Sequence, residues 1–491
     1  MLLDGMAGIR EEHLYFQITN NIKLVITGRT PDMTDNTQTP PEVHTNTPAS
    51  IEELNKLLTK LPPEFLQTLP AVFADVKQQL DIVCRNEYLT KKELGYRLNP
   101  EQKKYHELFW ILLTFSRSMS SSLLTIGNLK LTYVPTADVS DELHCFDQSL
   151  SKLLSVDEKW LKEGQEFIVE AMSDEAIYSS KLEGAVTTEA LAKEMIRKQL
   201  TPKTKDEMMI LNNHEAMQFI LNTKERKLSP EFICGIQRIV TKGTLANEDD
   251  SGRFRTSDDI YVVNQVTGDV LHYPPKAAEI PLMIQSLCDF VNADGKQNSD
   301  TKTFIHPLIV GIVLHFLIGY IHPFADGNGR TARSLFYWYV ISRGYTVFQY
   351  LPLSKMIKRS PSKYRDAYLH SEEDFLDLTY FIRYNISCIQ KARKELTEYI
   401  SRKIERETKQ AETKEMFSDL SERQYRILLY MADKAKESFS INEIAGWFNV
   451  VYQTARTDLM QLEARKYLRV SRTGKKQLYS IDSNLAGKLR G

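Results

Sequence analysis

The sequence predicts a mainly α-helical protein with one internal β-hairpin and a small C-terminal unit that carries a hairpin of its own. Apolar residues recur at helical spacing in the first part of the chain, for example at Leu54, Leu57, Leu58 and Leu61. The apolar run from Pro307 to Ile321 is too short to span a bilayer and is typical of a central buried helix. Together these patterns favour helical packing over a sheet-based fold.

Composition divides the chain into five segments. Residues 14–26 have a short strand-like pattern, and residues 28–50 are rich in Thr, Pro and Asn, which is typical of a flexible linker. A highly charged stretch follows Lys403. We therefore expect an N-terminal segment and linker (1–50), a helical N-terminal extension (51–139), a central region (140–403), a charged linker (404–420) and a C-terminal unit (421–491).

Length and composition favour a cytoplasmic protein. With 491 residues and 42% hydrophobic content, the chain can bury large cores in two or three domains. A net charge of −1 argues against general binding to nucleic acid or to a membrane surface. The start of the chain has no cationic segment followed by an apolar one, so no signal peptide is expected. The five cysteines are odd in number, scattered and without metal-site spacing, which predicts reduced thiols: Cys84, Cys145, Cys234, Cys288 and Cys388.

The run His322–Arg330 joins a glycine-rich turn to the start of a helix. Gly327, Asn328 and Gly329 disfavour regular structure, whereas the residues after them are typical of a buried helix. The first N–H groups of a helix have no partner within it, and the positive end of the helix dipole lies behind them. The turn is therefore predicted to bind phosphate.

Four chemically active side chains belong to the same turn and helix. His322 has an ordinary pKa near neutrality, which suits removal of a proton from an alcohol. Asp326 is a hard oxygen donor of the kind that Mg²⁺ prefers. Arg330 and Arg333 lie three residues apart on one helix face, where they can hold two successive phosphates.

This run resembles the signature of the Fic (Fic/Doc) family, His-Pro-Phe-x-Asp/Glu-Gly-Asn-Gly/Lys-Arg with a second Arg three residues later. The resemblance implies a Fic helical bundle over residues 140–403 and a protein adenylyltransferase that uses ATP and Mg²⁺. In such enzymes the histidine deprotonates a Ser, Thr or Tyr hydroxyl, which attacks the α-phosphate of ATP and expels pyrophosphate. The implied roles are a base at His322, a Mg²⁺ ligand at Asp326, a phosphate cradle at Gly327, Asn328 and Gly329, and neutralisation of the β- and γ-phosphates by Arg330 and Arg333.

Four residues near the signature have less specific patterns. We expect Phe324 to anchor the loop in the core. His306 and His315 are interpreted as structural histidines with satisfied hydrogen bonds. The resemblance makes Tyr364 a candidate for the adenine pocket, and packing of a partly exposed aromatic ring explains it equally well.

A second motif lies upstream, at residues 179–184. Ser179 and Glu183 are four residues apart on a predicted helix, and Gly184 is a natural left-handed helix end. The spacing alone fits an ordinary capped helix equally well. Beside the signature it resembles the Fic inhibitory motif in the intramolecular, class II arrangement, in which Glu183 pairs with Arg333. A glutamate there competes with a γ-phosphate for the same donors, and in relatives it also aligns water to remove AMP.

Residues 258–275 are predicted to form a hairpin around a Thr-Gly-Asp turn. By resemblance it is the Fic flap, which aligns a target segment as an added strand. The residues expected to meet the target are Ile260, Tyr261 and Val262. A surface hairpin without a partner is the alternative interpretation.

The C-terminal unit resembles a winged helix-turn-helix. Capping-box spacing at residues 421–424 and 440–443 opens two helices, a third covers residues 452–467, and residues 468–481 form a two-stranded wing. Residues 421–491 hold 13 Lys and Arg against 7 Asp and Glu, so contact with DNA and docking to a protein both remain open. The basic residues expected at a duplex are Arg456, Arg472, Lys475 and Lys476.

Three functions compete at this point. The leading hypothesis is an autoinhibited adenylyltransferase that modifies a target protein or itself. A nucleotide-sensing transcriptional regulator is the chief rival, although a sensor needs no base at His322. Transfer of a different phosphate-containing group is the third. No membrane partner is expected, a homo-oligomer stays open, and neither the target nor the nucleotide base is settled by these residues.

Overall fold

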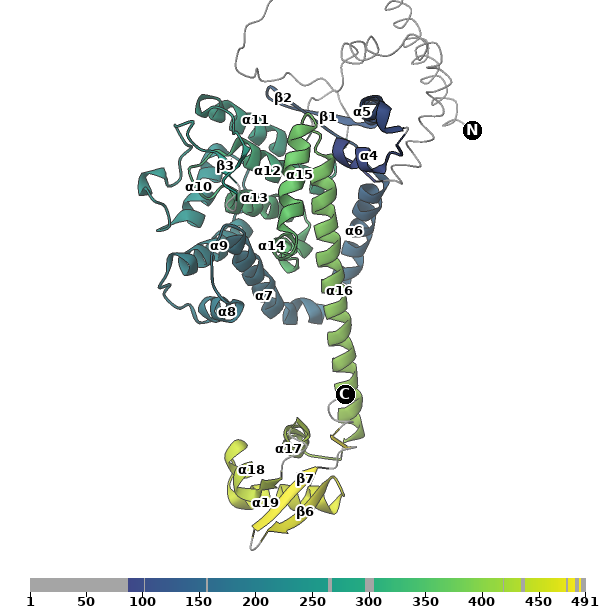
Figure 1. Cartoon of the computed structure of the whole chain (residues 1–491). Coiled ribbons are helices and arrows are strands. Elements are labelled where there is room, and N and C mark those ends of the chain that lie inside the picture. Colours follow the sequence, from purple (N-terminus) through teal and green to yellow (C-terminus); the bar gives the residue numbers. More distant parts are fainter. Residues whose placement is uncertain are drawn as a thin grey trace, which may run out of the picture. The chain divides into compact units, whose positions relative to one another are not determined.

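The computed structural model describes residues 87–491 apart from residues 101, 156–157, 264–266, 296–303, 418, 434–437, 474–475, 482–484 and 487–491. The predicted strand at 14–26, the linker at 28–50, the helical residues 51–86 and Cys84 lie outside the described residues. The chain divides into two compact units after Ala392, and each is treated separately below (Figure 1).

The first unit is built around two buried helices, α12 (Pro307–Ile321) and α13 (Asn328–Ser342). The bounds of α12 are those that the apolar run predicted. A Cβ atom on Gly311 would lie 2.9 Å from Val340 Cγ1, so this glycine lets the two helices approach closely. Around them pack α7 (Glu158–Leu182), α9 (Lys205–Asn222), α10 (Pro230–Thr241), α11 (Ile280–Asn292) and α14 (Leu353–Lys358) (Figure 1).

Further helices belong to this unit, which confirms the predicted mainly α fold. Among them are α6 (Ala137–Ser155), α8 (Glu189–Lys198) and α15 (Pro361–Glu373). The 3₁₀ helices are η1 (Gln102–Tyr105), η2 (Glu248–Asp250), η3 (Ala277–Glu279) and η4 (Thr346–Tyr350).

The N-terminal extension is not wholly helical, so that prediction was wrong in part. Helices α4 (Lys91–Arg97) and α5 (His106–Ser120) are followed by an antiparallel hairpin of β1 (Ser122–Ile126) and β2 (Leu129–Tyr133). The physical reason is local, because alternating side chains flank a Gly-Asn turn in which Gly127 has a φ of +58°. The apolar residues of this stretch fit helical and strand spacing alike.

The predicted flap hairpin is present and short. Strands β3 (Val262–Val263) and β4 (Val270–His272) pair antiparallel, with a register irregularity between Val262 and Val263. The hairpin lies outside the helical core, as the sequence predicted.

Helix α16 (Thr379–Met416) is continuous across the end of the first unit. The sequence placed the end of the central region after Lys403 and a linker at 404–420, whereas the compact units divide after Ala392. Most of the predicted linker is helix, because Glu, Lys and Arg are favourable helix formers.

The second unit contains three helices followed by a two-stranded hairpin, and its identity as a winged helix stays a prediction. Helices α17 (Glu422–Asp433), α18 (Ile441–Trp447) and α19 (Tyr452–Ala464) pack with a sheet of order β5-β7-β6. The capping box of Ser440 and Glu443 is formed. The strands are β5 (Phe439–Ser440), β6 (Leu468–Thr473) and β7 (Lys476–Ile481).

Among the helices that the structure describes, none combines the length and the apolar character needed to cross a membrane.

Candidate functional site

The loop between α12 and α13 is closed by its own side chains. His322 ends α12 in the left-handed region, at a φ of +46°, and its N–H donates to the carbonyl of Ile318 at 3.1 Å. Asn328 accepts the Phe324 N–H at 3.0 Å and donates to the Phe324 carbonyl at 2.8 Å. Phe324 is fully buried against Phe254, with ring centroids 5.4 Å apart, which confirms it as the core anchor. The Asn328 side chain thus shapes the loop, and Asn328 is also the first residue of α13, whose first N–H groups have no partner within the helix.

The imidazole of His322 is held as a neutral base. Its Nδ1 lies 3.2 Å from the carbonyl of Gly319, a group that only accepts, so Nδ1 carries the proton. Burial lowers the pKa of His322 to about 4, and Glu183 only partly opposes the shift. At neutral pH Nε2 therefore keeps a lone pair that can accept a proton.

Arg255 holds the backbone of His322 in place, a role that the sequence did not suggest. Its buried guanidinium donates to the carbonyls of His322 at 2.9 Å and Ser257 at 2.8 Å, and also to Pro275. The backbone N–H of Arg255 donates to the carbonyl of Pro323 at 2.8 Å. One side chain therefore ties the loop that begins at His322 to both ends of the flap hairpin. A lone Arg in a polar stretch gives no sequence signal of this kind.

The glycines of the turn make room for contacts from other elements. Gly327 has a φ of +86°, and a Cβ atom there would lie 2.6 Å from Thr241 Cγ2. A Cβ atom on Gly329 would lie 2.2 Å from Oε1 of Glu183. The carboxylate of Glu183 thus lies over the N-terminus of α13, where the unpaired N–H groups and the helix dipole favour negative charge.

Arg333 joins this N-terminus to the upstream motif. Its Nη2 donates to Glu183 Oε1 at 2.8 Å and to the Ser179 carbonyl at 3.0 Å, while Nε donates to Ser179 Oγ at 2.9 Å. Burial opposes the charged form of Glu183, but the charge and hydrogen bond of Arg333 outweigh it and hold the pKa below its ordinary value. Gly184 ends the motif at a φ of +96°. The structure therefore brings both predicted motifs together at one guanidinium.

Glu175 anchors the helix that carries this motif. Its buried carboxylate accepts from Tyr337 on α13 at 2.8 Å and from the Ser354 N–H on α14 at 2.8 Å. Burial raises the pKa of Glu175. The neighbouring Asp174 pairs with Lys355 at 2.9 Å. Helix α7 is thus held against α13 and α14 one turn before Ser179.

Arg330 and Asp326 form a second charged pair in the turn. Arg330 is buried and donates to the Val240 carbonyl at 2.6 Å and to Asp326 Oδ1 at 3.3 Å. In the described part of the chain, its Nε has no hydrogen-bond partner. The Asp326 side chain is 47% exposed. No group of three or more His, Cys, Asp or Glu with metal-site geometry occurs among the described residues, so Asp326 offers a single carboxylate.

Tyr364 lies beside Arg333 in the interior. Its hydroxyl is 2.9 Å from Nε2 of His315, and Arg333 acts on the pKa of Tyr364, which burial raises. His315 and His306 have hydrogen-bond partners, as expected of structural histidines; Asp147 lies 3.2 Å from His306 Nε2. These contacts explain Tyr364 by packing, and its place in an adenine pocket stays a prediction.

The flap is anchored at one side and exposed at the other. His272 contacts Glu372 Oε2 at 2.7 Å through Nδ1 and the Tyr320 carbonyl at 2.7 Å through Nε2. Tyr261 and Tyr273 pack edge to face and remain 48% and 71% exposed. The predicted target residues Ile260 and Val262 are half-buried.

A family model described as Fic/DOC family matches residues 227–340. The protein adenylyltransferase Fic of Drosophila willistoni is 28% identical over 148 residues, which are 29% of this chain and 27% of that protein. The protein of the same name from Nematostella vectensis is 24% identical over 230 residues, or 42% of this chain and 50% of that one. The chain thus matches between about a quarter and a half of the length of these curated relatives.

One solved structure supports the fold. A Fic family protein from Desulfovibrio desulfuricans G20 has a TM-score of 0.50 at 16% identity, and the likeness covers 71% of this chain and 96% of that one. The family match includes Arg255, the flap and the loop from His322 to Arg333. The upstream motif at residues 179–184 lies before it.

Proposed function

This chain is a Fic family protein, and from that premise we propose that it is an autoinhibited protein adenylyltransferase that transfers AMP from ATP to a Ser, Thr or Tyr hydroxyl. The observation that carries the proposal is the position of Glu183 on Arg333 and against Gly329, in the same turn as a neutral His322. A base, an anion site and an internal carboxylate that competes for that site are the parts that a restrained transferase needs.

In the proposed step, Nε2 of His322 accepts the proton of the incoming hydroxyl. The hydroxyl oxygen forms a bond to the α-phosphorus, the bond from that phosphorus to the bridging oxygen breaks, and pyrophosphate leaves with the electron pair. The product is a phosphodiester between AMP and the side chain. Arg255 keeps the His322 carbonyl in place during the transfer, because its guanidinium is itself buried and fully oriented.

Arg330, Arg333 and the first turn of α13 would neutralise the triphosphate. Arg333 cannot serve a γ-phosphate while it donates to Glu183 and Ser179. Slow basal transfer follows from this competition. The same carboxylate is suited to orient water for removal of AMP from a modified target, and we extend the proposal to that reverse activity.

Asp326 is the residue that would hold Mg²⁺. One partly exposed carboxylate beside a phosphate site fits this ion, which is commonly bound through one or two carboxylates together with substrate phosphates. The bound ion would neutralise charge on the phosphates.

The flap is proposed to receive the target as an added strand. Its exposed aromatic pair, Tyr261 and Tyr273, provides apolar contact area beside the strand edge. Because backbone hydrogen bonds dominate such pairing, self-modification is expected when no target is supplied.

The proposal is tested with labelled ATP, GTP, UTP and CTP in the presence of Mg²⁺. Wild type, Glu183→Gly and His322→Ala are compared for covalent label. We expect label on Glu183→Gly from one preferred nucleotide, much less on wild type, and none on Glu183→Gly/His322→Ala. Retained ATP binding without label in any variant would favour the nucleotide sensor. Label from a nucleotide other than ATP would show that a different nucleotide is transferred, and the proposed mechanism would stay the same.

For the C-terminal unit we propose contact with duplex DNA as a second function. Arg456 on α19 and Arg472 on β6 are exposed, at the positions that a recognition helix and a wing would present. Lys475 lies outside the described residues. A gel shift at low salt should show binding that weakens in Arg456→Ala. No binding to any duplex would leave protein docking as the role of this unit.

A further inference from the structure

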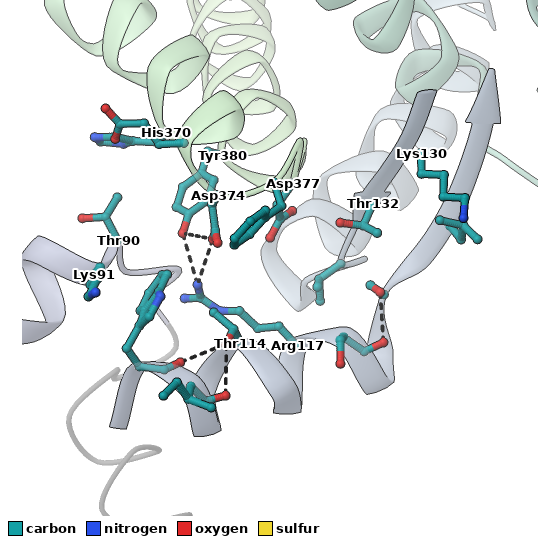
Figure 2. A pocket seen from close by; sticks show the side chains of 18 of the residues that line it. Thr90, Lys91, Thr114, Arg117, Lys130, Thr132, His370, Asp374, Asp377 and Tyr380 are labelled. Carbon is teal, nitrogen blue, oxygen red and sulfur yellow. Dashed lines mark hydrogen bonds and ion pairs between the residues drawn. The ribbon is translucent and has the colours of Figure 1, made fainter. Parts of the chain in front are cut away.

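A cavity of about 450 Å³ lies in the first unit, apart from the His322 loop (Figure 2). Its walls come from α5, from the β1–β2 hairpin and from the connection between α15 and α16. None of the residues of the catalytic loop or of the inhibitory motif lines it. Its volume is within the range of small-molecule sites.

Arg117 lines this cavity with a buried guanidinium. Its guanidinium lies 3.7 Å from the ring centre of Tyr88 and donates to the Leu89 carbonyl at 2.9 Å and to the Tyr380 hydroxyl at 3.2 Å. Asp374 is 4.0 Å away. Figure 2 shows the arginine reaching from α5 toward Asp374 and Tyr380. With these partners the arginine is fixed in one orientation and buried.

The α15–α16 connection is strained where it meets the cavity. Phe375 and Leu376 are consecutive residues with φ values of +54° and +58°, a conformation that is unfavourable for non-glycine residues. The Thr132 N–H donates to the Leu376 carbonyl at 3.2 Å, and the Leu378 N–H donates to the Thr132 carbonyl at 2.8 Å. Pairing with β2 thus maintains a turn that brings the carboxylates on either side of it into one cavity wall.

The charges of the cavity do not balance. Asp374 and Asp377 face one floor cation, Arg117. On the rim, Lys91 pairs with Glu107 at 2.8 Å, and Lys130 is matched in number by Glu373. Burial, followed by the charge of Asp377, raises the pKa of Asp374 to about 6, so this environment disfavours the charged carboxylate. A positive charge brought by a ligand would favour the charged carboxylate.

The remaining walls suit the body of an organic cation. Trp110 and Tyr380 provide aromatic surface, to which ammonium and guanidinium groups are attracted. Thr114 uses its hydroxyl proton on the carbonyls of Trp110 and Ile111, so its oxygen is left as an acceptor for N–H donors. We propose that this cavity binds a small organic amine or guanidine, with the cationic group at Asp374 and Asp377 and an apolar body against Trp110.

Residues that line the cavity directly follow, in the sequence, a residue that contacts the flap. Glu373 and Asp374 line the cavity, whereas Glu372 binds His272 at the base of β4. A bound amine is therefore placed to influence the flap, a consequence that rests on the proposed transferase. Binding itself is measured without any transfer reaction, so the two can fail separately.

The test uses the full-length chain with 2-phenylethylamine and agmatine as probes and 2-phenylethanol as the uncharged counterpart. Binding is followed by isothermal titration calorimetry and by the melting temperature. Asp374→Asn removes one charge and keeps an acceptor for Tyr380. Thr114→Phe fills the cavity and leaves its charges in place. Asp366→Asn, on α15 but not lining the cavity, is the matched control.

We expect saturable binding of at least one amine at millimolar concentration or below and none of the alcohol. Loss of one charge-assisted contact should weaken binding roughly tenfold in Asp374→Asn. Thr114→Phe should abolish binding, and Asp366→Asn should leave it unchanged. Equal binding of alcohol and amine, undiminished binding by a folded Asp374→Asn or Thr114→Phe, or no binding of either amine to wild type would overturn the proposal.

Discussion

Gly329 leaves room for the carboxylate of Glu183: a Cβ atom at position 329 would lie 2.2 Å from Oε1 of the glutamate. The carboxylate therefore lies where the turn would receive an anion, in addition to its ion pair with Arg333. Its side chain is 30% exposed, so solvent and ligands reach it. Under the proposed function, this internal anion at the N-terminus of α13 would compete with the phosphates of ATP for the same N–H groups.

Glu183→Gln should strengthen ATP binding and raise self-modification less than Glu183→Gly does. The amide keeps the volume of the side chain but loses the charge-assisted hydrogen bond to Arg333, a change of roughly tenfold in the Kd of ATP. Calorimetric titration with ATP measures it. Glu194→Gln, whose carboxylate pairs with Lys198 on the surface, is the control. An unchanged Kd in both Glu183 variants would contradict the competition.

The pH dependence of transfer should show a base that stays neutral in mild acid. The folded pKa of His322 is lowered to about 4, so the imidazole accepts protons only well below its ordinary range. Glu183 raises that pKa, so its removal shifts the transition further toward acid. In Glu183→Gly the rate of self-modification should be nearly constant from about pH 8 to about pH 5.5. A half-maximal rate near pH 6.5 would show an ordinary, solvated histidine instead.

Arg255→Ala should reduce turnover while ATP still binds. The guanidinium donates to the carbonyls of His322, Ser257 and Pro275, and among the described residues none of its hydrogen bonds reaches residues 327–329. Misplacing the base costs on the order of 100-fold in rate. In the Glu183→Gly background, kcat and the Kd of ATP are measured separately, and Arg255→Lys should recover part of kcat. Arg253→Ala, which loses only a surface pair with Asp250, should match its parent. A weaker Kd with an unchanged kcat would assign Arg255 to substrate binding.

Glu175→Ala should destabilise the protein and raise its basal activity together. The substitution leaves the Ser354 N–H and hydroxyl without their buried acceptor and leaves the Tyr337 hydroxyl with the Leu351 carbonyl alone, at a cost of about 2–4 kcal/mol. It also loosens α7, which carries Ser179 and Glu183. Thermal unfolding and self-modification are measured side by side. Glu170→Ala, on the same helix but exposed, should change neither. Lower stability without a rise in activity would contradict the idea that Glu175 maintains the contact of Glu183 with Arg333.

Local patterns in the sequence were sufficient to predict elements that depend only on neighbouring residues. The bounds of α12 follow from one apolar run, and the hairpin at residues 258–275 follows from two β-rich stretches around a turn. The turn at residues 327–329 and the motif at residues 179–184 were also singled out from their spacing, and their predicted roles stay predictions. In the N-terminal extension, the apolar residues of β1 and β2 fit both helical and strand spacing. They form strands because the two segments pair with each other across the Gly-Asn turn.

Taken by itself, the sequence determined which residues can do chemistry here, because a base, a carboxylate, glycines and arginines at fixed spacing need only a turn and a helix. The tertiary structure decided what each one contacts. It placed Glu183 on Gly329, directed the Asn328 amide to the Phe324 backbone and made Arg255 the support of His322. It also brought Asp374 and Asp377 to a cavity with Arg117. These contacts join residues up to hundreds of positions apart, and packing rather than local propensity brings such residues together.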